Sequence, residues 1–148
     1  MRKINWCINV KNGIELAEPN ENLVLAYIRK SEEALQARIA LKENKNWAIT
    51  ASYYSMYFAL YSILMKIGIK CEIHACSIEF MKEFLHKYFS KEECKILEDS
   101  MRARIDVQYY VDRTVPDNQS YNMIKNAPLF LVKCKEVLSK ISNEEINN

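Results

Sequence analysis

The stretch from Asn46 to Met65, NWAITASYYSMYFALYSILM, contains no charged residue. A segment of about 20 residues is long enough to cross a bilayer. This one holds an asparagine, a threonine, three serines and four tyrosines, whose polar groups are costly in lipid. A helix that is apolar on nearly all sides is typical of the centre of a helical bundle. We therefore expect no membrane span but a central helix that other helices surround.

The rest of the chain predicts those surrounding helices. With only 2 glycines and 3 prolines, it has too little turn chemistry for a many-stranded β fold. Asn20 is a good N-cap, Gly68 a C-terminal stop, and Ser90 with Glu93 a capping box, while Pro128 predicts a break in the last helix. We predict an all-α fold, an up-and-down bundle of four main helices plus short N-terminal and split C-terminal helices. The four main helices are predicted over residues 20–43, 46–67, 75–89 and 90–113, and the split C-terminal helix over residues 120–141.

The first residues leave a choice between a hairpin and a helix. Asn12-Gly13 between apolar runs is a strong hairpin signal. A two-residue turn there would place Val10 opposite Glu15, so apolar and polar side chains would share a face. We therefore predict a short helix over residues 3–11, closed by Gly13.

The cysteines and the N-terminal sequence indicate in which cellular compartment the protein is expected. The 5 cysteines form no CxxC pair, and their odd number suits reduced thiols better than a disulfide framework. The N-terminal MRKINWCINV lacks the long apolar run of a signal peptide. We expect a cytoplasmic protein. Its net charge of +2 is too small to predict nucleic-acid binding by itself.

The helix that carries RARIDVQYYVDR, residues 102–113, combines an apolar stripe with polar side chains. Arg104 and Gln108 fall inside that stripe, one turn apart, whereas Arg102, Asp106 and Tyr110 point elsewhere. A buried guanidinium needs a partner. Arg104 therefore either reaches the bundle edge, pairs with a core carboxylate, or faces a cleft or a second subunit. The predicted stripe consists of Cys94, Leu97, Met101, Ile105 and Val111.

Several of these features together resemble the HEPN domain, a helical-bundle family found in prokaryotic defence and toxin–antitoxin systems. The shared features are a tyrosine-rich helix that ends in Lys-Ile-Gly, a turn containing His74 before the next helix, and an arginine on the helix after that. The resemblance spans about residues 20–141. It implies a HEPN-like bundle over 20–142, preceded by an extension over 1–19 that packs on it and followed by a frayed tail, 143–148.

The resemblance also identifies what is missing. Active ribonucleases of the family carry an arginine, four to six further residues and then a histidine. Metal-free RNA cleavage needs a group for the 2′-hydroxyl proton and a cation for the phosphorane charge. After Arg104 and four to six further residues, the chain has Tyr109, Tyr110 or Val111 in place of the histidine. The same spacing from Arg102 also leads to no histidine. Tyrosine is a poor base at neutral pH. We therefore interpret the helix that carries residues 102–113 as a former catalytic helix that has lost its histidine.

The two histidines and the tyrosines are the remaining residues to consider as catalytic or ligand-binding candidates. His74 is either a turn residue or a displaced base, and His86 is expected at the surface or an edge. Cys71, His74 and Cys76 match no standard zinc spacing, so we expect neither a metal nor a cofactor. Tyr53, Tyr57 and Tyr61 recur at helical spacing, which is more typical of core packing than of a base-stacking platform. The ligand-binding candidates are Arg104, Gln108, Tyr109, Asp106, Arg102, Tyr57 and His74, and the catalytic candidates are Arg104, His74 and Tyr109.

Three functional hypotheses follow. The first is a degenerate HEPN module that binds a nucleotide, an RNA phosphate or a partner protein. By resemblance, that partner is a minimal nucleotidyltransferase. The second is a metal-independent ribonuclease toxin that uses His74, and the third is a purely structural dimer. The missing histidine favours the first and third. In all three we expect a homodimer, with Arg104 of each chain lining a shared groove.

Overall fold

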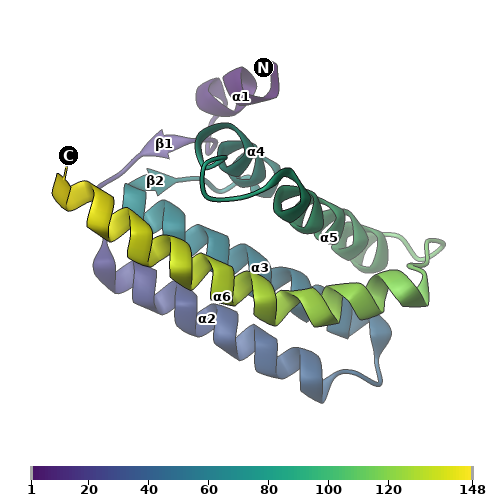
Figure 1. Cartoon of the computed structure of the whole chain (residues 1–148). Helices are drawn as coiled ribbons and strands as arrows, with labels where there is room; N and C mark the ends of the chain where they lie inside the picture. Colours follow the sequence, from purple (N-terminus) through teal and green to yellow (C-terminus); the bar gives the residue numbers. More distant parts are fainter. Residues whose placement is uncertain (1, 148) are drawn as a thin grey trace.

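The computed structural model describes the backbone of residues 2–147 and the side chains of residues 3–141. Within this part the chain forms six helices and one pair of very short strands, which confirms the all-α prediction (Figure 1). None of the described helices is long and apolar enough to span a membrane. The elements are α1 (Arg2–Asn9), β1 (Glu15–Leu16), α2 (Glu21–Ala40), α3 (Lys45–Ile67), β2 (Ile69–Lys70), α4 (His74–Phe84), α5 (Lys91–Tyr109) and α6 (Asp117–Asn147).

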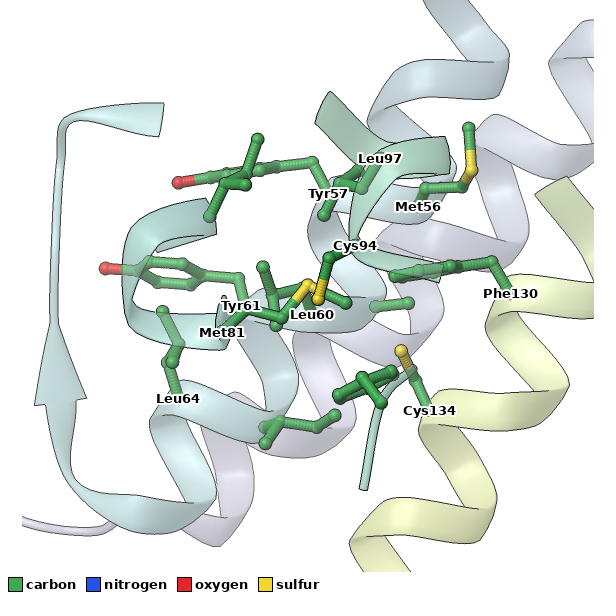
Figure 2. Close-up of a cluster of buried hydrophobic side chains, with 14 of the residues drawn as sticks. Met56, Tyr57, Leu60, Tyr61, Leu64, Met81, Cys94, Leu97, Phe130 and Cys134 are labelled. Carbon is green, nitrogen blue, oxygen red and sulfur yellow. The ribbon is translucent and has the colours of Figure 1, made fainter. Parts of the chain in front are cut away.

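Helix α3 is the central helix, as its uncharged sequence predicts. It packs against α2, α5 and α6, and Figure 1 shows it enclosed by these three. Most of its side chains beyond the first turn are buried, including Ile49, Met56 and Leu60, whereas Trp47 in the first turn is exposed. Figure 2 shows Leu60 meeting side chains from neighbouring helices, among them Cys94 of α5 and Phe130 of α6. Burial of this surface is the main source of stability in such a bundle.

Small polar residues allow α2 and α3 to approach closely. The Ser31 hydroxyl donates to the Ser55 carbonyl at 2.6 Å, and the Ser55 hydroxyl donates to the Ser31 carbonyl at 3.0 Å. Both serines are fully buried. The reciprocal bonds satisfy two hydroxyls inside the apolar contact, so burying them there carries little penalty.

Several helix ends lie where capping chemistry places them. The Asn20 side chain accepts the backbone N–H of Leu23, and Ser90 with Glu93 forms the predicted capping box. Gly68 ends α3 with φ +99°, and an added Cβ would lie 2.6 Å from the Ala17 carbonyl oxygen. Only glycine fits there without strain.

Other boundaries were predicted wrongly. Asn44, rather than Asn46, caps α3, because its side chain accepts the N–H of Trp47. Helix α4 ends at Phe84 instead of residue 89, and α5 ends at Tyr109 instead of residue 113. Tyr110 has extended backbone, so the residues after it leave the helix.

The predicted split of the C-terminal helix was also wrong. Helix α6 continues through Pro128. Its flanking residues Ala127, Leu131 and Cys134 are buried, and α6 packs along α3. This packing compensates for the one backbone hydrogen bond that proline removes. The backbone of α6 extends to Asn147, within the segment predicted as a tail, and Asn148 lies outside the described residues.

The N-terminal segment forms the predicted helix instead of the hairpin, but Asn12 takes the left-handed conformation expected of Gly13, with φ 64°. Gly13 instead permits a close approach, since an added Cβ would lie 2.1 Å from the Cys7 carbonyl oxygen. Beyond it, β1 pairs with β2 in antiparallel register, Glu15 with Lys70.

Two cysteines contradict the prediction of reduced thiols throughout. Cys7 of α1 and Cys76 of α4 form a disulfide, whereas Cys71, Cys94 and Cys134 are free and buried. The sequence does not reveal the pair because 69 residues separate the partners. Only the docking of α1 on α4 brings them together, so the N-terminal extension is covalently attached to the bundle.

We predict that Cys7→Ser lowers the free energy of unfolding by about 2–4 kcal/mol under oxidising conditions, because a long-range crosslink restricts the unfolded chain. Urea unfolding followed by circular dichroism measures this difference. In the presence of a reductant, wild type and variant should unfold at nearly the same urea concentration. An equal stability of the two proteins without reductant would contradict the prediction.

Candidate functional site

Arg104 lies on the buried face of α5 and is only 7% exposed. The buried face of α5 differs from the predicted apolar stripe at the C-terminal end of the helix. Val111 lies beyond the helix and is fully exposed, whereas Ser100 and Ala103 are buried beside Cys94 and Leu97. The expectation that Arg104 enters the buried seam is thereby confirmed.

The partners of Arg104 are aromatic and neutral. Its guanidinium carbon lies 4.9 Å from the ring centroid of Tyr53 and 5.5 Å from that of Tyr54, both on α3. Its Nη1 donates to Oε1 of Gln108 at 3.3 Å. Its Nε is buried and has no hydrogen-bond partner among the described residues. Aromatic faces attract a cation but accept no strong hydrogen bond, so Arg104 keeps unused donor capacity.

His74 is the first residue of α4 and meets the same part of α3. Its Nδ1 is hydrogen-bonded to the Tyr53 hydroxyl at 2.7 Å. Its ring is stacked on Tyr57, with the centroids 3.9 Å apart and an interplanar angle of 11°. Tyr53 therefore contacts both candidates, His74 through its hydroxyl and Arg104 through its ring.

Burial decides the protonation states in this cluster. Desolvation, followed by the positive charge of Arg104, lowers the pKa of His74 to about 4, so the imidazole is neutral at pH 7. Desolvation also raises the pKa of Tyr53 and of Tyr57, whose hydroxyl is hydrogen-bonded to Ser77 at 2.8 Å. Arg104 is thus the charged group among neutral partners.

The other sequence candidates lie outside this cluster or at its edge. Arg102 is exposed and forms ion pairs with Glu98 and Asp99. Asp106 pairs with Arg113 at 2.9 Å. Tyr109, the last residue of α5, is 65% exposed, and its ring centroid is 6.0 Å from the Arg104 guanidinium.

Tyr53 and Tyr54 were not among the site residues predicted from the sequence. Tyr53 belongs to the tyrosine series noted on α3, but the periodicity alone cannot show which ring carries the arginine. His86 is exposed, as expected. In the part of the chain that the structure describes, no three metal-ligating side chains cluster, and Cys76 is held in the disulfide.

A cleft of about 330 Å³, here called the tyrosine cleft, lies beside His74. Its aromatic wall comes from Tyr27 of α2 and from α3, and its other wall from the end of β2 and the two residues after it. Figure 2 shows Tyr57 and Tyr61 leaving α3 in the same direction, with their hydroxyls pointing away from the core. The lining residues are Tyr27, Tyr57, Phe58, Tyr61, His74 and residues 70–72.

The described chain thus forms a bundle whose central helix is covered by others, with an arginine of α5 buried opposite a row of tyrosines on α3. A family model described as HEPN domain matches residues 24–137, so the chain belongs to the HEPN family. No curated protein matches the chain. Family membership supports a nucleotide- or RNA-related function in general.

We predict that Arg104→Met raises the pKa of His74, because it removes the nearby positive charge. The pKa should stay below 6.5, since desolvation is the larger cause of the shift. An NMR titration of the histidine Cε1 proton measures it, and His74→Gln assigns the resonance. Arg102→Met is the matched control and should leave this pKa unchanged. A His74 pKa unaffected by Arg104→Met would contradict the coupling.

We also predict that acidification lowers the stability. The unfolded chain binds a proton at His74 near pH 6.5, whereas the folded protein does so only near pH 4. The contribution of His74 to the free energy of unfolding is therefore fully present above about pH 6.5. It is lost as the pH falls toward 4. Urea unfolding of wild type and His74→Gln at pH 7, 5.5 and 4.5 isolates this contribution. The difference between the two proteins should change with pH, and a constant difference would contradict the prediction.

Proposed function

We propose that the protein is a non-catalytic HEPN module that binds a phosphate of a nucleotide or RNA through Arg104. The observation that carries this proposal is a buried guanidinium without a carboxylate partner among the described residues. Gln108, which accepts the hydrogen bond from Nη1 of Arg104, is exposed. A phosphate oxygen can therefore replace the amide oxygen and form a stronger, charge-assisted bond.

A second feature near this cluster also favours an anion. Helix α4 has no side-chain N-cap, and its first residue is His74. Uncapped N–H groups at a helix N-terminus, together with the helix dipole, attract phosphate. Arg104 would provide the fixed charge, and the α4 N-terminus would contribute the positive end of its dipole, although its Cys76 N–H is already hydrogen-bonded to the Ile73 carbonyl.

Neither candidate base, Tyr109 or His74, is well suited to accept a proton from RNA. Tyr109 stands at the end of α5, where the resemblance places the histidine of active members. His74 contacts Tyr53, which carries Arg104 on its ring, and this favours the ribonuclease with a displaced base as the second candidate. However, Nδ1 of His74 is engaged by Tyr53, and a pKa of about 4 makes the imidazole a weak proton acceptor near neutral pH. We therefore favour binding without cleavage.

The proposal includes a homodimer with α5 near the two-fold axis. The cytoplasmic location expected from the sequence stays a prediction, because the Cys7–Cys76 disulfide removes one of its two grounds. Tyr109 at the end of α5 and Tyr110 and Val111 directly after it are exposed, and Tyr109 lies near Arg104. A second copy would cover this apolar surface. By family resemblance, a minimal nucleotidyltransferase is the proposed partner protein. A purely structural dimer is the third candidate, and it predicts no ligand binding at Arg104.

We predict that Arg104→Ala weakens binding of ribose 5-phosphate and of a short RNA at least about tenfold, because charge-assisted hydrogen bonds are lost. Isothermal titration calorimetry measures both affinities. Arg102→Ala, which removes an exposed and ion-paired arginine from the same helix, is the control and should bind as wild type does. Equal binding by Arg104→Ala and wild type would exclude this helix from the function.

We predict further that Tyr109→His folds normally, since the side chain is 65% exposed, and gains weak RNA cleavage in the presence of EDTA. The introduced group has a pKa near 6.5 and lies close to a fixed cation. Cleavage of a labelled RNA oligonucleotide reports the activity. The double variant Tyr109→His/Arg104→Ala is the control and should be inactive. Cleavage that persists in the double variant would show that Arg104 is not involved.

A further inference from the structure

We propose that the Cys7–Cys76 disulfide is a reversible redox switch, whose reduction by a small thiol releases α1 from the bundle while the other helices stay folded. The disulfide joins the N-terminal extension to α4. The inference does not rest on the proposed phosphate site, since no residue of that site takes part in the crosslink.

The first argument is that little besides the disulfide holds α1 in place. The helix has 8 residues, and an isolated helix shorter than about 12 residues is marginal in water. Among its described side chains only Ile4 and Cys7 are buried, whereas Trp6 and Ile8 are exposed. It packs on α4, and Figure 1 shows it apart from α2 and α6. Burial of two side chains does not offset the entropy of ordering a whole helix, so α1 needs the crosslink.

The second argument is that the segment after α1 is anchored without the disulfide. The Asn12 carbonyl accepts the backbone N–H of Glu72 at 3.0 Å, and the Ala17 N–H donates to the Gly68 carbonyl at 2.8 Å. Between these two bonds, β1 pairs with β2. Reduction removes none of these backbone contacts. The released segment therefore ends before Asn12, whose φ of 64° marks the turn that follows α1.

The third argument is that α4 has its own attachment to the bundle. Its side chains Ile78 and Met81 are buried, and α4 packs on α5. Ser77, the residue after Cys76, is hydrogen-bonded to the Tyr57 hydroxyl of α3 at 2.8 Å. These contacts keep α4 in place when α1 leaves, so the change that reduction causes is local.

A groove gives a small thiol access to the crosslink. It has a volume of about 340 Å³, lies between α1, α4 and α5, and is lined by both cysteines. Cys7 and Cys76 are themselves almost fully buried. Exchange therefore proceeds when α1 opens locally, as a short helix with few buried side chains does readily. Cys76 lies in the first turn of α4, where the helix dipole stabilises a departing thiolate.

The chemistry is thiol–disulfide exchange with glutathione. Its thiolate attacks Sγ of Cys7, the S–S bond breaks, and the electron pair leaves with Cys76, which takes up a proton from water. A second glutathione thiolate attacks the mixed disulfide and releases Cys7, which is protonated in the same way. Two electrons thus pass from two glutathione thiols to the cystine, and glutathione disulfide is the other product. Oxidation by glutathione disulfide is the reverse reaction.

The experiment is hydrogen–deuterium exchange of the full chain, oxidised by glutathione disulfide or reduced by excess glutathione. Amides of α1 should exchange at least about tenfold faster in the reduced protein, close to the rate of an unstructured segment. Peptides of α3 should remain strongly protected in both states. Cys7→Ala should show fast exchange of α1 in both buffers. Cys94→Ala is the matched control, because it removes a free cysteine outside the crosslink and should respond as wild type does.

Alkylation of free thiols in the unfolded chain, read by mass spectrometry, shows whether the crosslink opens. The oxidised protein should take up label at 3 cysteines and the reduced protein at all 5. A crosslink that persists in excess glutathione would overturn the proposal, because a permanent structural disulfide resists this thiol. Slow exchange of α1 after reduction would show that the helix stays docked without the crosslink. Loss of protection in α3 together with α1 would show that the disulfide holds the whole fold, and either result would also overturn the proposal.

Discussion

The burial of α3 is the constraint on which the rest of the structure depends. Because most side chains of this helix beyond its first turn are buried, α2, α5 and α6 must enclose it. The tyrosines on α3 are large enough to reach the boundary of the core, where their hydroxyls require partners. Those partners come from α4 and the segment before it, namely His74, Ser77 and the Cys71 backbone. The packing of one helix therefore determines where the polar cluster forms.

Burial also sets the chemistry of that cluster. Solvation by water would favour a protonated histidine at mildly acidic pH, but the aromatic surroundings keep His74 neutral. The same surroundings hold Arg104 by the faces of Tyr53 and Tyr54 instead of a carboxylate. A cation held in this way keeps its charge and its hydrogen-bond donors for a ligand. An arginine that is paired with an aspartate, as Arg113 is with Asp106, attracts an anion less strongly, because the carboxylate offsets its charge and occupies its donors.

Elements defined by local chemistry could be predicted from the sequence. The caps at Asn20 and Ser90 and the stop at Gly68 depend on neighbouring residues only, and they were predicted correctly. Helix α6 shows the opposite case, because Pro128 indicates a break that packing against α3 overrides. The disulfide between Cys7 and Cys76 depends on the docking of two distant segments, which no local pattern encodes.

The sequence alone determined the helical class, the central position of α3, the entry of Arg104 into the buried seam and the lack of a histidine at the usual spacing after it. These follow from periodicity and counting, which act within a single helix. Only the tertiary structure decided that Tyr53 joins Arg104 to His74, that Arg102 and Asp106 belong to separate ion pairs, and that aromatic rings from α2 and α3 line one cleft. The reason is that hydrogen bonds and ring contacts between helices depend on how the helices pack, and packing is a property of the whole chain.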